Sequence, residues 1–184
     1  MSAQPARPRA SAAPPTALHR TRNAISTGQQ FRRVSDARRL PANFARAIDD
    51  NRLEEFPDFF VADGVYKVAS RFNVERGLPL AHIYCTNRGM IADRIASIRK
   101  ANIYQPHRYR HLISGIHVEG IAGEVATARA SYLVLRIMDD GATSIFSSGE
   151  YRDAVLLRGD SALFRERTVL FDSKSIETLL AIPL

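Results

Sequence analysis

The richest chemical cluster in the sequence is a basic and aromatic run, His107-Arg108-Tyr109-Arg110-His111, followed by His117. Two histidines and a carboxylate make the facial site of non-haem iron, and Asp93 or Glu119 could supply the carboxylate. The spacing argues against this use, because His111 and His117 on one strand lie roughly 20 Å apart at about 3.3 Å per residue. We therefore expect the cluster to form hydrogen bonds at a strand start or a subunit contact.

Acid–base catalysis is a second interpretation of the same cluster. His111 beside Asp93 could abstract a proton while Tyr109 or Tyr66 polarises a carbonyl, as in cone-shaped dehydratases and isomerases. The alternative is that paired charges on a helix and its facing strand fix their packing. The sequence leaves both open, because nothing in it shows that these groups converge.

Cys85 is the single cysteine among 184 residues. One cysteine excludes an internal disulfide, and it excludes any cluster or zinc site that needs two thiolates from this chain. Its apolar neighbours Ile83 and Tyr84 predict a buried, inert thiol. The sequence contains neither a phosphate-binding glycine motif nor a GxSxG nucleophile motif.

The net charge of +7 lies entirely in the first part of the chain. Residues 1–40 hold eight arginines and one acid, whereas residues 41–184 carry 18 bases and 18 acids. We expect this Pro-, Ala- and Arg-rich tail to be disordered. A nucleic-acid arm, a transit peptide and an inert extension compete as its function, and we favour the inert extension. No apolar run approaches the length of a membrane span.

Residues 41–184 are expected to form one α+β domain. Apolar spacing predicts helices over Ala42–Asn51 and Asn87–Lys100, with a further helical face between Leu53 and Phe60. A strand is predicted from Val65 to about Asn73 and a short one at 83–85. Four long strands follow over Tyr109–Val118, Glu124–Met138, Thr143–Leu157 and Ala162–Asp172. Strands this long must curl, so N-terminal helices over the curled antiparallel or mixed sheet predict a cone.

The last strand and the end of the chain suggest a subunit contact. Arg165 and Arg167 stand among apolar residues, and the sequence closes on Leu179-Leu180-Ala181-Ile182-Pro183-Leu184. Such an apolar segment packs either on its own core or against a second subunit.

Four segments, in order, resemble the small (beta) subunit of bacterial aromatic-ring-hydroxylating dioxygenases: "MIADRIASIRKANIY", "HRYRHLIS", "SGEYRD" and "ERTVLFDSKSIETLLAIPL". The likeness runs from about Phe44 to Leu184. The segments "LEEFPDFF", "RGLPLAHIY", "KANIYQPHRYRH" and "VLRIMDDGATSIFSSGEY" are most similar to the branch that acts on carboxylated aromatics, such as the terephthalate 1,2-dioxygenase and salicylate 5-hydroxylase small subunits.

The resemblance implies the cone fold of nuclear transport factor 2 and scytalone dehydratase. It implies a cytoplasmic bacterial oxidoreductase in which three beta chains associate with one another and with three alpha subunits. The alpha subunit would carry a Rieske [2Fe-2S] cluster and a mononuclear non-haem iron, and a reductase would supply electrons from NAD(P)H. The beta chain would hold the assembly together, with no catalytic residue, cofactor or metal of its own.

The residues agree with the resemblance on one point. A Rieske cluster needs two cysteines and two histidines, and this chain has one cysteine. The first hypothesis is therefore a structural subunit. Its candidate interface ion pairs are at Arg108, Arg110, His111, Arg165 and Arg167. The alternatives are a stand-alone cone-fold dehydratase or isomerase that uses His111, Asp93 and Tyr109, and a basic-tailed module that binds nucleic acid.

Overall fold

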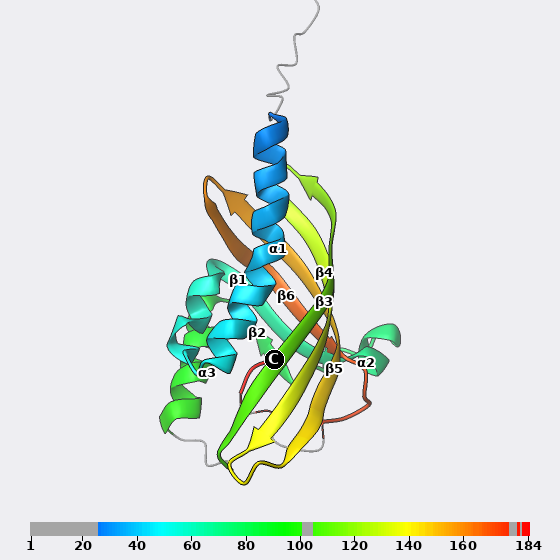
Figure 1. Ribbon diagram of the computed structural model, residues 1–184. Coiled ribbons are helices and arrows are strands. Elements are labelled where there is room, and N and C mark those ends of the chain that lie inside the picture. Colours follow the sequence, from blue (N-terminus) through cyan, green and yellow to red (C-terminus); the bar gives the residue numbers. More distant parts are fainter. Residues whose placement is uncertain (1–25, 101–104, 177–179, 181) are drawn as a thin grey trace, which may run out of the picture.

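The computed structural model describes residues 26–100, 105–176, 180 and 182–184. Figure 1 shows α1 and α3 gathered on one side of a strongly twisted sheet, which confirms the expected α+β architecture. In chain order the elements are α1 (Thr27–Asp49), the 3-10 helix η1 (Leu53–Phe59), β1 (Phe60–Ser70), α2 (Arg71–Glu75), β2 (Ile83–Cys85), α3 (Arg88–Lys100), β3 (His107–Ala122), β4 (Val125–Met138), β5 (Thr143–Arg158) and β6 (Ser161–Phe171).

The sheet is mixed and has the strand order β2-β1-β6-β5-β4-β3. β1 and β6 run parallel, and every other neighbouring pair is antiparallel. Strands of 14 to 16 residues accumulate twist, and bulges in the β3–β4, β4–β5 and β5–β6 ladders bend them further. Gly149 permits a close approach of β6 to β5, since a Cβ there would lie 1.9 Å from the carbonyl oxygen of Leu170.

Helix α1 begins well before the expected domain boundary at residue 41. Ser26 caps it through a capping box with Gln29, and Ala37 and Leu40 are buried. Residues 27–40 therefore form a helix, and the prediction of disorder was wrong for them. The physical reason is that Ala37 and Leu40 extend the apolar stripe of Phe44 and Ile48 towards the N-terminus. Residues 1–25 of the expected tail lie outside the described residues.

The core is an aromatic cluster between α1, η1 and the sheet. The ring of Phe44 lies 4.6 Å from that of Phe56 and 5.5 Å from that of Phe164, measured between centroids. Phe60 lies 5.3 Å from Phe164. These four side chains are almost completely buried, so they fix how α1 crosses the concave face of the sheet.

The remaining expected elements are found with small shifts of their ends. Helix α3 buries Ile91, Ile95 and Ile98, as the spacing predicts. The four long strands lie within a few residues of their predicted bounds, and β1 starts five residues earlier than predicted. None of the helices in the described ranges combines the length and the apolar character that crossing a membrane requires.

Candidate functional site

The interior of the cone holds a buried ion pair. Asp153 on β5 and Arg167 on β6 are register partners, and the arginine donates to the carboxylate from Nε at 2.8 Å and from Nη2 at 2.7 Å. The two side chains are 1% and 0% exposed. The guanidinium carbon also lies 4.1 to 4.4 Å from the ring centroids of Phe44, Tyr151 and Phe164. The pair and the three rings therefore fill this part of the interior.

This geometry corrects the expectation for Arg167. The sequence places it among candidate ion pairs with a partner subunit, but its side chain is closed to solvent and is paired with Asp153 of the same chain. A side chain with no exposed surface cannot reach a second subunit. The sequence could not distinguish the two uses, because both place a charge between apolar residues on a strand.

Three buried tyrosines form another part of the interior. The Tyr66 hydroxyl donates to the carbonyl oxygen of Leu184 and accepts from its N–H, both at 3.1 Å. Tyr132 stacks on Tyr151 with centroids 4.5 Å apart and shares a hydrogen bond of 3.0 Å with Ser147. Burial raises the pKa of all three phenols well above their ordinary value, so they stay neutral.

His111 forms a second buried pair, with Asp49. The imidazole Nδ1 lies 2.6 Å from Oδ1 of Asp49, and the same carboxylate accepts from the backbone N–H of His111 at 3.0 and 3.2 Å. The His111 side chain is 0% exposed and that of Asp49 is 6% exposed. Because Asp49 ends α1 and His111 lies on the edge strand β3, the pair fastens the helix end to the sheet edge.

The catalytic combination of His111 with Asp93 and Tyr109 does not form. Asp93 lies exposed on α3, and the carboxylate at His111 is that of Asp49. Tyr109 lies 6.2 Å from His111 between ring centroids and stacks on Phe146 at 4.9 Å. Sequence reasoning missed Asp49, although an acid at a helix C-terminus opposes the helix dipole and so calls for a compensating partner.

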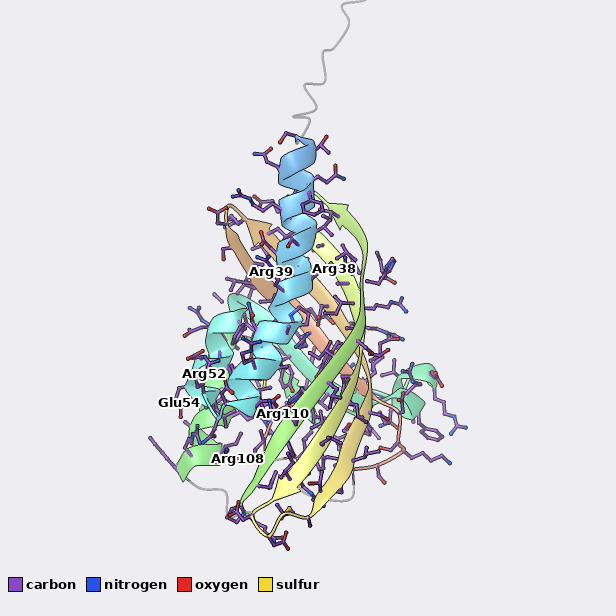
Figure 2. All side chains as sticks on the ribbon, in the orientation of Figure 1. Arg38, Arg39, Arg52, Glu54, Arg108 and Arg110 are labelled. Atoms are coloured by element: carbon purple, nitrogen blue, oxygen red, sulfur yellow. The ribbon has the colours of Figure 1, made fainter. Side chains whose placement is uncertain are left out.

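A cleft of about 860 Å³ opens beside this pair, between the ends of α1 and α3 and the start of β3. Asp49, Arg99, Arg108 and Arg110 contribute to its lining. Arg108 and Arg110 are exposed, and Arg110 approaches Asp49 only to 4.0 Å. Figure 2 shows Arg110 and Arg108 below the end of α1, and Arg38 and Arg39 further up that helix.

The outer face of the sheet carries an apolar patch next to Arg108 and Arg110. The register pairs Leu112 on β3 with Leu133 on β4, and Leu135 on β4 with Ile145 on β5. Leu112 is 49% and Ile145 69% exposed, and Leu133 and Leu135 are half-buried. We call these four residues the outer patch. Sequence reasoning missed it, because their common face depends on the register between three strands.

The other sequence-predicted residues are placed as follows. Arg165 is exposed on β6 and lines a separate pocket of about 510 Å³ with Arg88 and Arg158. Cys85 is buried in β2, and this burial raises the pKa of its thiol, which disfavours nucleophilic chemistry. Within the described ranges, no group of three or more His, Cys, Asp or Glu side chains is arranged to hold a metal ion.

Comparison with known proteins assigns the chain to a family. A family model described as a SnoaL-like domain matches residues 30–168. The chain is 35% identical to the anthranilate 1,2-dioxygenase small subunit of Burkholderia cepacia, over 74% of this chain and 85% of that one. It is 36% identical to subunit beta 1 of the terephthalate 1,2-dioxygenase terminal oxygenase component of a Comamonas species, over 78% and 93% of the two chains.

Solved structures agree with these relatives. A chain classified as the beta subunit of an aromatic-ring-hydroxylating dioxygenase, from Novosphingobium aromaticivorans, is 39% identical, with a TM-score of 0.77 over 86% of this chain and all of that one. A protein of the same organism classified as a scytalone dehydratase shares the fold at 17% identity, with a TM-score of 0.63 over 80% and 89% of the two chains.

This chain is thus a member of the SnoaL-like domain family. Within it, the chain belongs to the small or beta subunits of aromatic-ring-hydroxylating dioxygenases, which are oxidoreductases. The expected cone fold is confirmed.

Proposed function

We propose that this chain is the non-catalytic beta subunit of a terminal oxygenase that dihydroxylates a carboxylated aromatic. The observation that carries the non-catalytic role is the filling of the cone by the chain's own side chains. The Arg167–Asp153 pair occupies one part of the interior, and Tyr66 bonded to Leu184 occupies another. These two parts of the interior are filled by the chain's own side chains, which supports a structural role.

The oxygen chemistry belongs to an alpha partner with a Rieske cluster and a mononuclear iron. The donor set of this chain does not fit a Rieske cluster, because Cys85 is its single cysteine and the cluster needs two. We further propose, as the family resemblance implies, that the chain belongs to a cytoplasmic assembly of three alpha and three beta subunits that receives electrons from an NAD(P)H-dependent reductase.

The proposed substrate class rests on the relatives. Anthranilate and terephthalate, named for two of them, are both aromatic carboxylates. The assembled oxygenase is therefore expected to turn over terephthalate or anthranilate at least tenfold faster than toluene, at equal reductase and NADH. Faster turnover of toluene would contradict this substrate class.

The outer patch is the proposed contact with partner subunits. Its four apolar side chains form a centre, and Arg108 and Arg110 form a charged rim, which is the usual anatomy of a protein–protein interface. Arg165 remains a proposed second contact, since it is exposed on another part of the surface. His111 supports the interface indirectly, because it fastens α1 beside the two arginines.

Turnover of the assembled oxygenase tests the non-catalytic role. His111→Gln removes the imidazole next to the cleft of about 860 Å³ but leaves Arg108 and Arg110 in place. We expect kcat per iron to stay within twofold of the wild-type complex at equal size on gel filtration. A loss of 100-fold in a fully assembled complex would assign chemistry to this chain.

A further inference from the structure

The end of the described chain lies inside the mouth of the cone. Leu180, Ile182 and Leu184 are all buried, with exposures of 7%, 8% and 0%. Figure 1 marks the C-terminus next to β2 and beside the lower part of α1. We call residues 180 and 182–184 the strap. Its apolar side chains belong to the same hydrophobic cluster as Tyr66, Cys85 and Ile95 of the cone wall.

Two cone residues bind the backbone of the strap. The Tyr66 hydroxyl both donates to and accepts from Leu184. Arg94 on α3 donates from Nη2 to the carbonyl oxygen of Leu180 at 2.6 Å. These contacts use backbone groups that any residue offers. Tyr66 and Arg94 therefore bind the backbone of the strap, and its three apolar side chains pack beside them.

Arg94 is poorly matched to the strap. Its Nε is buried and has no hydrogen-bond partner. No carboxylate pairs with its guanidinium among the described residues, whereas Arg99 one turn further along α3 pairs with Glu54 at 2.7 Å. A guanidinium edge offers two parallel donors, and one carbonyl oxygen satisfies one of them. A carboxylate would accept from both Nε and Nη2.

We propose that the strap occupies a binding site for a small apolar carboxylic acid. The carboxylate takes the Arg94 edge, and the hydrocarbon body replaces the strap side chains beside Tyr66. The strap then acts as an intramolecular competitor of the acid, and competitors on the same chain typically act at an effective concentration in the millimolar range. An acid of moderate affinity therefore binds weakly to the intact chain. It binds more tightly to a chain in which the strap side chains are shortened.

Calorimetry and thermal unfolding of the full-length chain test this site. The probe is 4-methylpentanoate, which joins a leucine-like side chain to a carboxylate. The variant Leu180→Ala, Ile182→Ala, Leu184→Ala keeps the backbone and removes most of the competing apolar volume. We expect it to bind the probe at least tenfold more tightly than the wild-type chain does, with a rise of several degrees in Tm at 10 mM probe.

The alcohol 4-methylpentan-1-ol is the matched control for the carboxylate. We expect it to bind at least tenfold more weakly than the acid, and we expect this difference to vanish when Arg94→Met is added. Equal binding of acid and alcohol, or a folded variant that binds neither, would overturn the proposal. If the triple variant does not fold, Leu184→Ala alone gives the same comparison and the same contrary outcomes.

Discussion

Asp153 and Arg167 lie opposite each other on β5 and β6 and form two hydrogen bonds, at 2.8 and 2.7 Å, in a site closed to solvent. The aromatic faces of Phe44, Tyr151 and Phe164 surround the guanidinium. Burying two charged groups costs desolvation free energy. The attraction and the well-aligned hydrogen bonds between the two groups offset this cost. The pair therefore acts as a fixed part of the core, whereas the exposed outer patch is the contact that we propose for partners.

Asp153→Ala is predicted to destabilise the chain strongly. It leaves the Arg167 guanidinium buried without a counter-charge, which typically lowers the free energy of unfolding by about 3–5 kcal/mol. Urea unfolding of the isolated chain measures the change. Arg165→Ala, at an exposed position on the same strand as Arg167, is the control and should change stability by less than about 0.5 kcal/mol. Equal effects of the two substitutions would mean that the pair is not the core element described above.

Tyr66→Phe is predicted to loosen the end of the chain. It removes the hydroxyl that satisfies both backbone groups of Leu184, and buried groups left without partners cost about 1–3 kcal/mol. Hydrogen exchange at Leu184 should accelerate together with the loss of stability. Tyr84→Phe, on the exposed side of β2, is the matched control. Unchanged exchange at Leu184 in the Tyr66 variant would argue against this contact.

Stability is predicted to fall at alkaline pH. Burial holds the pKa of Tyr66, Tyr132 and Tyr151 well above the ordinary value near 10, so the unfolded chain releases these protons first. The contribution of the protonated phenols to the free energy of unfolding is complete below about pH 10. Above that pH, the free energy of unfolding decreases by about 1.4 kcal/mol per pH unit for each phenol. Urea unfolding between pH 9 and 11.5 measures the slope. Tyr151→Phe should reduce the slope by about one phenol's share, whereas an unchanged slope would contradict the assignment.

Asp49→Ala is predicted to detach the end of α1 from β3. The carboxylate accepts from both the backbone and the ring of His111, and hydrogen bonds to a charged group contribute about 1.5–3 kcal/mol. A loss of about 2–3 kcal/mol in the free energy of unfolding is expected. Asp50→Ala, at the exposed neighbouring position, should cost much less. Similar losses in the two variants would show that Asp49 has no special role.

Local signals predicted most of the fold. The isoleucine spacing of α3 and the long alternating strands were enough to place those elements and to predict a curled sheet. The start of α1 was missed, because its first turns are arginine-rich and its buried stripe of Ala37 and Leu40 is thin. The Pro-, Ala- and Arg-rich composition of residues 1–40 indicates disorder more strongly than the sparse apolar spacing of residues 27–40 indicates a helix.

The site was less predictable, because it depends on register. Asp153 and Arg167 are 14 positions apart in the chain, and only the β5–β6 pairing makes them partners. The outer patch likewise needs the alignment of three strands before Leu112 and Ile145 share a surface. His111 was recognised from its neighbours, but its true partner Asp49 lies 62 positions away.

Co-purification with the cognate alpha subunit tests most directly whether this chain is a docking subunit. Ile145→Asp places a carboxylate at the most exposed position of the outer patch, and burying it without a partner opposes association. Thr127→Asp, an exposed position on β4 outside the patch, is the control. The account predicts that the Ile145 variant folds but elutes without the alpha subunit, while the Thr127 variant elutes with it. Co-elution of the Ile145 variant in wild-type yield would contradict the proposed interface.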